Sequence, residues 1–248
     1  MMCLLNKIMK QLEKKIVKWI GKKVKQAKAK GVVFGLSGGL DSAVVAGLVK
    51  KAVGKNHLAL ILPCHSTKSA TQDAKLLVKK LKLKSKIIDL TYPFDCFKKI
   101  LPKTNSLAQA NIKPRLRMIT LYYFANSLDY LVCGTGNKSE LMVGYFTKYG
   151  DGGVDILPIA NLLKRDVKKL AKSLGIPDKI INKSPSADLW PGQTDEGEMG
   201  ITYKELDLVL SGMGTKKKTK LSKSKVNKVK KMISQSEHKR QLAQIFKG

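Results

Sequence analysis

The chain has 248 residues, a length that suits one α/β domain with at most a small appendage. A hydrophobic content of 43% with 6% aromatic residues is ordinary for a globular core and excludes wholesale disorder. The formal net charge of +30 invites a nucleic-acid partner, but only four of the 48 cationic side chains are arginines, and the lysines are spread over the whole length. We therefore interpret the charge first as solvated lysines, second as attraction of anionic nucleotides, and last as RNA binding.

In chain order, helical and strand patterns alternate. The N-terminal region 1–29 places apolar side chains at helical spacing opposite lysines, which predicts an amphipathic helix. Its apolar start is too short for a signal peptide, and no stretch approaches the roughly 20 apolar residues of a membrane span, so we expect a cytoplasmic protein. Short apolar runs and longer periodic runs then predict strands at 32–36, 58–62, 86–90 and 130–133 and helices at 42–53, 71–81, 106–128 and 137–143. This alternation predicts a doubly wound parallel sheet with helices on both faces.

The second half of the chain has a less regular texture. A helix is predicted at 163–174, and 185–200 has the composition of a mobile loop. The lysine-rich variable segment 211–231 is interpreted as solvated or partly disordered, and the apolar residues of 237–246 as docking back onto the body. We expect the whole chain, 1–248, to form a single domain.

The cysteines carry no metal or redox pattern. Cys3, Cys64, Cys96 and Cys133 form no CxxC pair, which disfavours a zinc ribbon or a dithiol redox site. A chain of this size does not need disulfides, and Cys133 lies in an apolar run typical of a buried position.

The strongest chemical signal is the turn Ser37 to Ser42, which follows an apolar strand and opens a helix. The backbone N–H groups of a glycine turn there converge with the N-terminal end of the next helix to form a phosphate site. The spacing matches neither a Walker A loop nor a Rossmann fingerprint. Because a carboxylate beside phosphates is repulsive unless a cation lies between them, we expect Mg²⁺ on Asp41. The residues expected to form this phosphate site are Gly35, Leu36, Ser37, Gly38, Gly39, Leu40, Asp41 and Ser42, and the resemblance described next implies that the phosphates are those of ATP.

This turn, in its strand–turn–helix context, resembles the signature of the pyrophosphatase-type ATP enzymes, whose fold is adenine nucleotide alpha hydrolase-like. The alternative, a glycine turn with a capping aspartate, would suit a shorter motif better. The resemblance implies that ATP is split between its α and β phosphates. It also implies that a substrate oxygen takes the AMP while the loop holds the departing pyrophosphate.

Further segments, in the same order and at similar spacing, are similar to those of NAD synthetases: 110–118, 134–140, 144–155, 185–189, 193–196 and 237–240. The similarity runs from about residue 30 to residue 240. It implies ATP- and Mg²⁺-dependent amidation of deamido-NAD by ammonia through an adenylated carboxylate, with NAD, AMP and pyrophosphate as products. NAD synthetases are typically homodimers, and the apolar stretch 106–128 is a candidate for that interface or for the core.

The same resemblance implies roles for individual residues. Glu140 would be the second Mg²⁺ ligand beside Asp41, and three further residues would contact ATP: Thr135, Lys164 and Ser186. Deamido-NAD is expected to contact Arg115, Lys148, Asp155, His238 and Lys239. Asp151 is expected to hold ammonium and take a proton before attack, and Lys164 is counted with it among the catalytic residues. Plain surface placement of the lysines and salt bridging of the arginines on a helix are the alternatives.

Two rival functions are kept beside the synthetase. One is a tRNA-modifying enzyme of the same loop class, which would show RNA-dependent ATP use; the other is a basic nucleotide- or RNA-binding module without turnover. Free ammonia is the expected nitrogen donor, because a glutaminase domain needs well over about 100 extra residues. Trp190 is expected either to cover the active site or to pack against the body.

Overall fold

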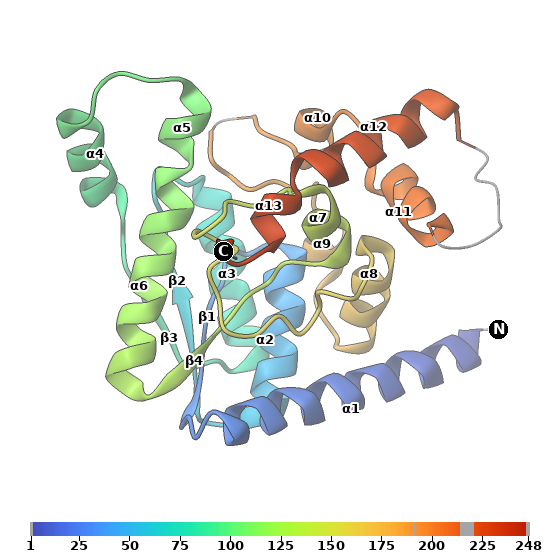
Figure 1. Ribbon diagram of the computed structural model, residues 1–248. Helices are drawn as coiled ribbons and strands as arrows, with labels where there is room; N and C mark the ends of the chain where they lie inside the picture. Colours follow the sequence, from blue (N-terminus) through green and yellow to red (C-terminus); the bar gives the residue numbers. More distant parts are fainter. Residues whose placement is uncertain (1, 191, 214–220, 247–248) are drawn as a thin grey trace.

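The fold is built on a four-stranded parallel sheet (Figure 1). The computed structural model describes residues 2–190, 192–213 and 221–246, and its strands run in the order β3–β2–β1–β4. Their bounds are β1 Gly31–Gly35, β2 His57–Ile61, β3 Ser85–Ile87 and β4 Tyr130–Cys133. The two central strands, β1 and β2, are apolar runs buried along nearly all of their length, as expected when helices cover both faces. The predicted doubly wound sheet is confirmed.

One face of the sheet is covered by helices from both halves of the chain. They are α1 (Met2–Gln26), α2 (Leu40–Val53), α3 (Lys68–Leu81), α8 (Lys164–Ser173) and the short α9 (Asp178–Ile181). Phe34 of β1 points to this face and packs with Ile20 of α1 and Leu170 of α8, all fully buried. Each such side chain contributes about 1.5–3 kcal/mol through burial. Among the described helices, none is long and apolar enough to span a membrane.

The opposite face is covered by α4 (Thr91–Ile100), α5 (Ser106–Ala110) and α6 (Ile112–Leu128). Val33 of β1 alternates with its neighbours to face this side, where it packs with Leu116 and Ala125 of α6. The two cores therefore meet only through the sheet, and the sheet holds both layers in one register.

A third cluster lies beyond the carboxyl ends of β1 and β4. It joins α7 (Lys138–Val143), α11 (Tyr203–Gly212) and α12 (Lys223–Gln235), with the short α10 (Asp195–Met199) and α13 (Glu237–Arg240) beside them. Leu206 and Val229 are fully buried here. Arg240 fastens α13 by donating to the carbonyls of Met142 (2.8 Å) and Ile233 (2.7 Å). These C-terminal helices thus form one wall above the sheet.

The helix predicted at 106–128 is two helices, α5 and α6. Asn111 ends α5 and begins α6, and Pro114 lies in the first turn of α6, where its missing N–H has no intrahelical partner to lose. The predicted strand 86–90 is the shorter β3, and the helix predicted at 71–81 begins earlier, at Lys68, because Thr67 accepts the N–H of Ala70 as its cap. Helix α4 was not predicted.

Three expectations for the C-terminal part differ in detail from the structure. Residues 223–231 of the lysine-rich segment belong to α12, which Ser222 caps and Val229 anchors. The lysines of α12 are solvated as expected, and residues 214–220 lie outside the described part. The stretch 237–246 docks only through α13, since Leu242, Ile245 and Phe246 are at least 85% exposed. The expected loop 185–200 contains the helix α10, which Thr194 caps.

Candidate active site

The site begins at the turn between β1 and α2, where the chain wraps around Ser42. The Ser42 hydroxyl accepts the N–H of Ser37 (3.3 Å) and donates to the carbonyl of Gly39 (3.0 Å). Gly38 has a φ of +81°, and a Cβ there would lie 2.5 Å from the carbonyl oxygen of Ala70. Only glycine fits this position, so the turn can present backbone N–H groups to an anion at the start of α2.

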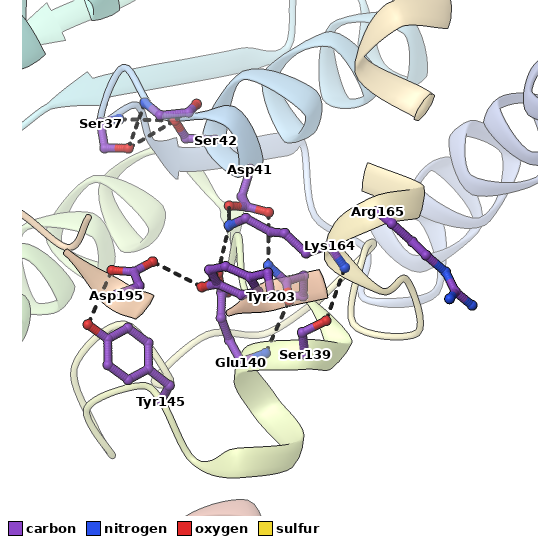
Figure 2. A network of polar contacts seen from close by, with 12 residues as sticks. Ser37, Asp41, Ser42, Ser139, Glu140, Tyr145, Lys164, Arg165, Asp195 and Tyr203 are labelled. Carbon is purple, nitrogen blue, oxygen red and sulfur yellow. Dashed lines mark hydrogen bonds and ion pairs between the residues drawn. The ribbon is translucent and has the colours of Figure 1, made fainter. Parts of the chain in front are cut away.

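Two carboxylates and one ammonium form the charged centre of the site (Figure 2). Lys164 Nζ lies 2.6 Å from Asp41 Oδ2 and 3.0 Å from Glu140 Oε1, and 3% of the lysine side chain is exposed. Asn137 joins the two acids, because it caps α7 through the N–H of Glu140 (3.1 Å) and donates from Nδ2 to Asp41 Oδ1 (3.0 Å). The first turns of α2, α7 and α8 therefore meet at one point.

Neighbouring helices fix the start of α8, where Lys164 is the first residue. Its N-cap, Leu163, has no side-chain cap. Instead, Asp207 of α11 accepts the N–H of Arg165 (2.9 Å) and the hydroxyl of Ser139 (2.5 Å), and Ser139 Oγ accepts the N–H of Lys164 (3.0 Å). A carboxylate at a helix N-terminus is favourable, and here it also sets the direction of the lysine side chain.

Burial dominates the electrostatics of this centre. It raises the pKa of Glu140 to about 7; the ammonium of Lys164 opposes this shift and the charge of Asp41 adds to it. For Lys164, burial alone would lower the pKa, but the two carboxylates raise it above its usual value. The lysine is therefore charged at neutral pH, and one cation stands between the two acids.

The acid pair fits Mg²⁺. The described residues contain no group of three or more His, Cys, Asp or Glu side chains that could hold a metal. Mg²⁺ is commonly bound by one or two carboxylates together with water and substrate phosphates. The two carboxylates already converge on a cation, Lys164 Nζ, and they adjoin the phosphate-binding turn.

A chain of hydrogen bonds leads away from the acid pair. The Tyr203 hydroxyl lies 3.1 Å from Glu140 Oε1 and 2.9 Å from Asp195 Oδ2 (Figure 2). The Tyr145 hydroxyl lies 3.2 Å from Asp195 Oδ1 and 2.8 Å from Glu198 Oε2. Sequence reasoning gave no role to either tyrosine. Asp195 stood within a recognised segment, 193–196, but nothing local to it indicated a buried carboxylate between two tyrosines.

A cavity of about 610 Å³ opens over these groups, a volume typical of nucleotide and cofactor sites. All the residues predicted to hold ATP line the cavity except Gly38, whose backbone faces α3 instead. Lys164, Glu140, Thr135 and Ser186 all line it, as does Trp190. The cavity thus gathers the predicted ATP and metal residues, and Trp190 is among the residues that line it.

The residues predicted to hold deamido-NAD are only partly brought together. Lys239 lines the cavity and donates to the carbonyls of Gly144 and Phe146, whereas Arg115, Lys148 and His238 form a connected group outside it. Within that group, Lys148 Nζ donates to the carbonyl of His238 (2.6 Å), and Arg115 donates to the carbonyl of Lys148 (3.4 Å). Asp155 lies elsewhere, as described next.

Two aspartates near the cavity differ in their surroundings. Asp151 lines the cavity and accepts the N–H of Thr147 (2.8 Å), and burial raises its pKa above the usual range. The Asp155 carboxylate does not line the cavity; it accepts the Tyr122 hydroxyl (2.9 Å) and the Val132 N–H (2.7 Å). Asp151 can therefore meet a small reactant directly, while both oxygens of Asp155 are engaged within the chain.

The fold and the site define a class. A glycine turn at the carboxyl end of a parallel strand, an acid pair beside it and a nucleotide-sized cavity at the switch point between β1 and β4 are the features of a phosphate-binding α/β enzyme that splits ATP. Within that class, the family model for NAD synthase matches residues 12–243, and the chain belongs to that family.

Individual relatives support the same family. The NH(3)-dependent NAD(+) synthetase of Carboxydothermus hydrogenoformans is 49% identical over 237 residues, which cover 93% of this chain and 95% of that protein. Among solved structures, the NMN synthetase of Francisella tularensis has a TM-score of 0.89 and 39% identity, covering 96% of this chain and 98% of the other. The NH3-dependent NAD synthetase of Campylobacter jejuni has a TM-score of 0.84 and 32% identity, covering 96% and 99%. The predicted resemblance is confirmed, and the tRNA-modifying alternative is set aside.

Proposed function

We propose that this chain catalyses the ATP-dependent amidation of deamido-NAD by ammonia, with NAD, AMP and pyrophosphate as products. The observation that carries the proposal is the acid pair Asp41–Glu140, which shares a buried lysine beside a glycine phosphate turn and opens on a cavity of about 610 Å³. Identity of 49% to a protein named as an NH(3)-dependent NAD(+) synthetase, over nearly the full length of both chains, supports the same activity.

The first step joins the nicotinate carboxylate of deamido-NAD to the α-phosphate of ATP, and the bond to pyrophosphate breaks. The phosphate turn would hold the departing pyrophosphate through its backbone N–H groups and the hydroxyls of Ser37 and Ser42. Asp41 and Glu140 would hold Mg²⁺, which supplies charge neutralisation to the phosphates when bound. Lys164 would turn its ammonium from the acids toward the phosphates, because it is long enough to serve either side.

In the second step, ammonium loses one proton, the resulting ammonia attacks the adenylated carboxylate, AMP leaves, and a second proton is released to solvent. Asp151 is the group proposed to hold ammonium and to accept the first of these protons, before the attack. It lines the cavity, its carboxylate is oriented by the N–H of Thr147, and its pKa is raised by burial, which brings it closer to the range useful for proton transfer. Trp190 and its neighbours would keep water from the adenylate.

The outer group Arg115, Lys148 and His238, with Lys239 at the cavity edge, is proposed to bind the second nucleotide of deamido-NAD. A second candidate substrate is the mononucleotide, nicotinate mononucleotide. The likeness to the Francisella tularensis NMN synthetase favours it, with a TM-score of 0.89 and 39% identity. A mononucleotide would have no second nucleotide for the outer group to bind, so the two substrates differ in their need for these cations.

We also propose a homodimer and a cytoplasmic location. Support for the dimer is the exposure of several large apolar side chains on α4, α5 and α6, namely Tyr92, Ile100, Leu107, Ile119 and Tyr123. A second copy of the chain would cover apolar surface that a monomer leaves in water.

The test is product formation by the purified protein with ATP and Mg²⁺. Deamido-NAD and nicotinate mononucleotide are supplied in parallel, each with ammonium or with glutamine. The proposal expects NAD and pyrophosphate in a one-to-one ratio from deamido-NAD with ammonium alone. A higher kcat/KM for the mononucleotide would transfer the assignment to the second candidate, and no amide product from either substrate would refute both.

A further inference from the structure

The chain of hydrogen bonds behind the acid pair continues to the segment Pro185–Trp190, which lines the cavity and is called the covering segment below. Gln193 Nε2 donates to Glu198 Oε2 (2.8 Å), and Gln193 Oε1 accepts the N–H of Leu189 (2.8 Å). The base of the same segment is closed by the N–H of Asp195, which donates to the carbonyl of Pro185 (3.0 Å). Asp195 thus holds the covering segment in two ways. Its N–H contacts the segment directly, and its carboxylate contacts the segment indirectly through Tyr145.

Tyr203 is the point at which this chain meets the acid pair. Its side chain is 5% exposed, its ring lies 4.6 Å from the ammonium of Lys164, and its hydroxyl is shared between Glu140 and Asp195. Its backbone N–H donates to Glu196 (2.8 Å), which ties α11 to α10. One side chain therefore contacts the lysine and one acid of the charged centre as well as the anchor of the covering segment.

The hydroxyl of Tyr203 carries one hydrogen but faces two carboxylates, at 3.1 Å and 2.9 Å. Burial and the neighbouring carboxylates raise the pKa of this hydroxyl, so it keeps its hydrogen. The hydrogen is shared between Asp195 and Glu140 Oε1, and the same oxygen of Glu140 also pairs with Lys164. If Asp41 and Glu140 held Mg²⁺, Glu140 would be a weaker acceptor, and the Tyr203 hydrogen would go to Asp195.

We propose that Tyr203 is a positioning residue that couples occupation of the phosphate site to the placement of the covering segment Pro185–Trp190. This inference rests on the proposed function and adds a residue to it. When the Tyr203 hydroxyl donates to Asp195, the contact at the base of the segment is strengthened. The Tyr145 hydroxyl can then donate to Glu198, 2.8 Å away, and Glu198 in turn accepts a hydrogen bond from Gln193. Binding of nucleotide then brings Trp190 over the adenylate before ammonia enters.

Tryptophan fluorescence tests the coupling directly. The chain has two tryptophans, so Trp19→Phe leaves Trp190 as the sole reporter. In that background, binding of Mg²⁺–ATP without deamido-NAD should lower acrylamide quenching of Trp190 about twofold or more. With Tyr203→Phe added, Mg²⁺–ATP should bind within about twofold of the background Kd, measured by calorimetry, while the quenching no longer changes. Removing a hydrogen bond to a charged group should lower kcat/KM for deamido-NAD by about 10- to 100-fold.

Two further variants complete the design. Tyr145→Phe breaks the next link and should also abolish the Trp190 response. Tyr130→Phe removes a hydroxyl at the start of β4, remote from the cavity, and should respond like the background. Thermal melts establish that each variant is folded.

The outcomes separate the coupling from the proposed function. If the background forms NAD but Trp190 does not respond to Mg²⁺–ATP, or if the folded Tyr203→Phe variant responds fully, the coupling is wrong and the proposed function stands. If Tyr203→Phe alone fails to fold, the response of Tyr145→Phe decides the question. If the background neither binds Mg²⁺–ATP nor forms NAD, the proposed function fails and the coupling fails with it.

Discussion

Lys164→Met removes the only described cation that pairs with the buried acids Asp41 and Glu140. Methionine keeps much of the side-chain volume, so the variant leaves two carboxylates facing each other without a neutralising charge. Breaking a buried ion pair by removing one partner costs about 3–5 kcal/mol of unfolding free energy. We expect a loss of that size at pH 8.5, measured by urea denaturation with circular dichroism.

The pH dependence follows from Glu140. Its pKa is raised in the folded protein to about 7, whereas its ordinary value is 4.5. A carboxyl group whose pKa is higher in the folded than in the unfolded protein stabilises the fold at a pH below its unfolded-state pKa. This stabilisation is lost as the pH rises through its folded-state pKa. Without the ammonium of Lys164, the folded pKa of Glu140 rises further. The deficit of Lys164→Met should therefore be smallest near pH 6, where Glu140 is neutral, and largest at pH 8.5.

Mg²⁺ should restore part of the unfolding free energy that Lys164→Met loses, because it can bind to the same two carboxylates. At 10 mM Mg²⁺, a Kd of about 1 mM would return about 1.4 kcal/mol. Lys169→Met is the matched control on the same helix, since Lys169 pairs with Asp166 at the surface and its loss should cost less than about 0.5 kcal/mol. Equal stability of Lys164→Met and the parent at pH 8.5, or equal stabilisation of both by Mg²⁺, would refute the reasoning.

Three further predictions follow from single positions. Gly38→Ala should lower the unfolding free energy by about 2 kcal/mol or more and weaken ATP binding, because the new Cβ would meet Ala70. Gly175 also has a positive φ, +70°, but no atom lies near the position of a Cβ, so Gly175→Ala should cost only about 1–2 kcal/mol in urea denaturation. Asp151→Asn should lower kcat about 100-fold or more while the Kd of ATP is unchanged, and unchanged turnover would remove Asp151 from the mechanism. Ile119→Lys, on the exposed face of α6, should convert a dimer to monomers in analytical ultracentrifugation, whereas Leu76→Lys on α3 should not.

Local patterns predicted the parts of the site that are built locally. The turn Ser37–Ser42 follows from a strand, glycines and a helix that are contiguous in sequence, and the structure has all three in that order. The meeting of Asp41 with Glu140 was implied by the family resemblance and not by local patterns; in the structure it follows because β1 and β4 are neighbours with parallel carboxyl ends. Topology alone brings those two acids together, even though 99 residues separate them.

The rest depends on contacts that no short pattern records. Lys164 was assigned through the family resemblance, and its place between the acids is set by Asp207, which caps α8 from a different helix. Tyr203 lies 63 residues from Glu140 in sequence and stands at the start of an ordinary amphipathic helix. Helix α12 shows the same limit, since its lysine content masks the two valines, Val226 and Val229, that pack it against α7 and α11.

Acidic residues outnumber basic residues around the cavity, whereas basic residues outnumber acidic ones in the chain as a whole. Among the described residues, six acidic residues line the cavity (Asp41, Glu140, Asp151, Asp188, Asp195 and Glu198), but only four lysines and arginines do (Arg117, Lys164, Lys183 and Lys239), although the sequence has 18 acidic and 48 basic residues. Two nucleotides bring further negative charge to this place, so binding requires cations that the cavity itself does not supply in excess. The surface lysines can attract the nucleotides only over about one Debye length, roughly 8 Å at physiological salt. Within the cavity, Lys164 is the cation that pairs with both Asp41 and Glu140. If the proposed Mg²⁺ binds to the same two carboxylates, it must compete with this ammonium for them.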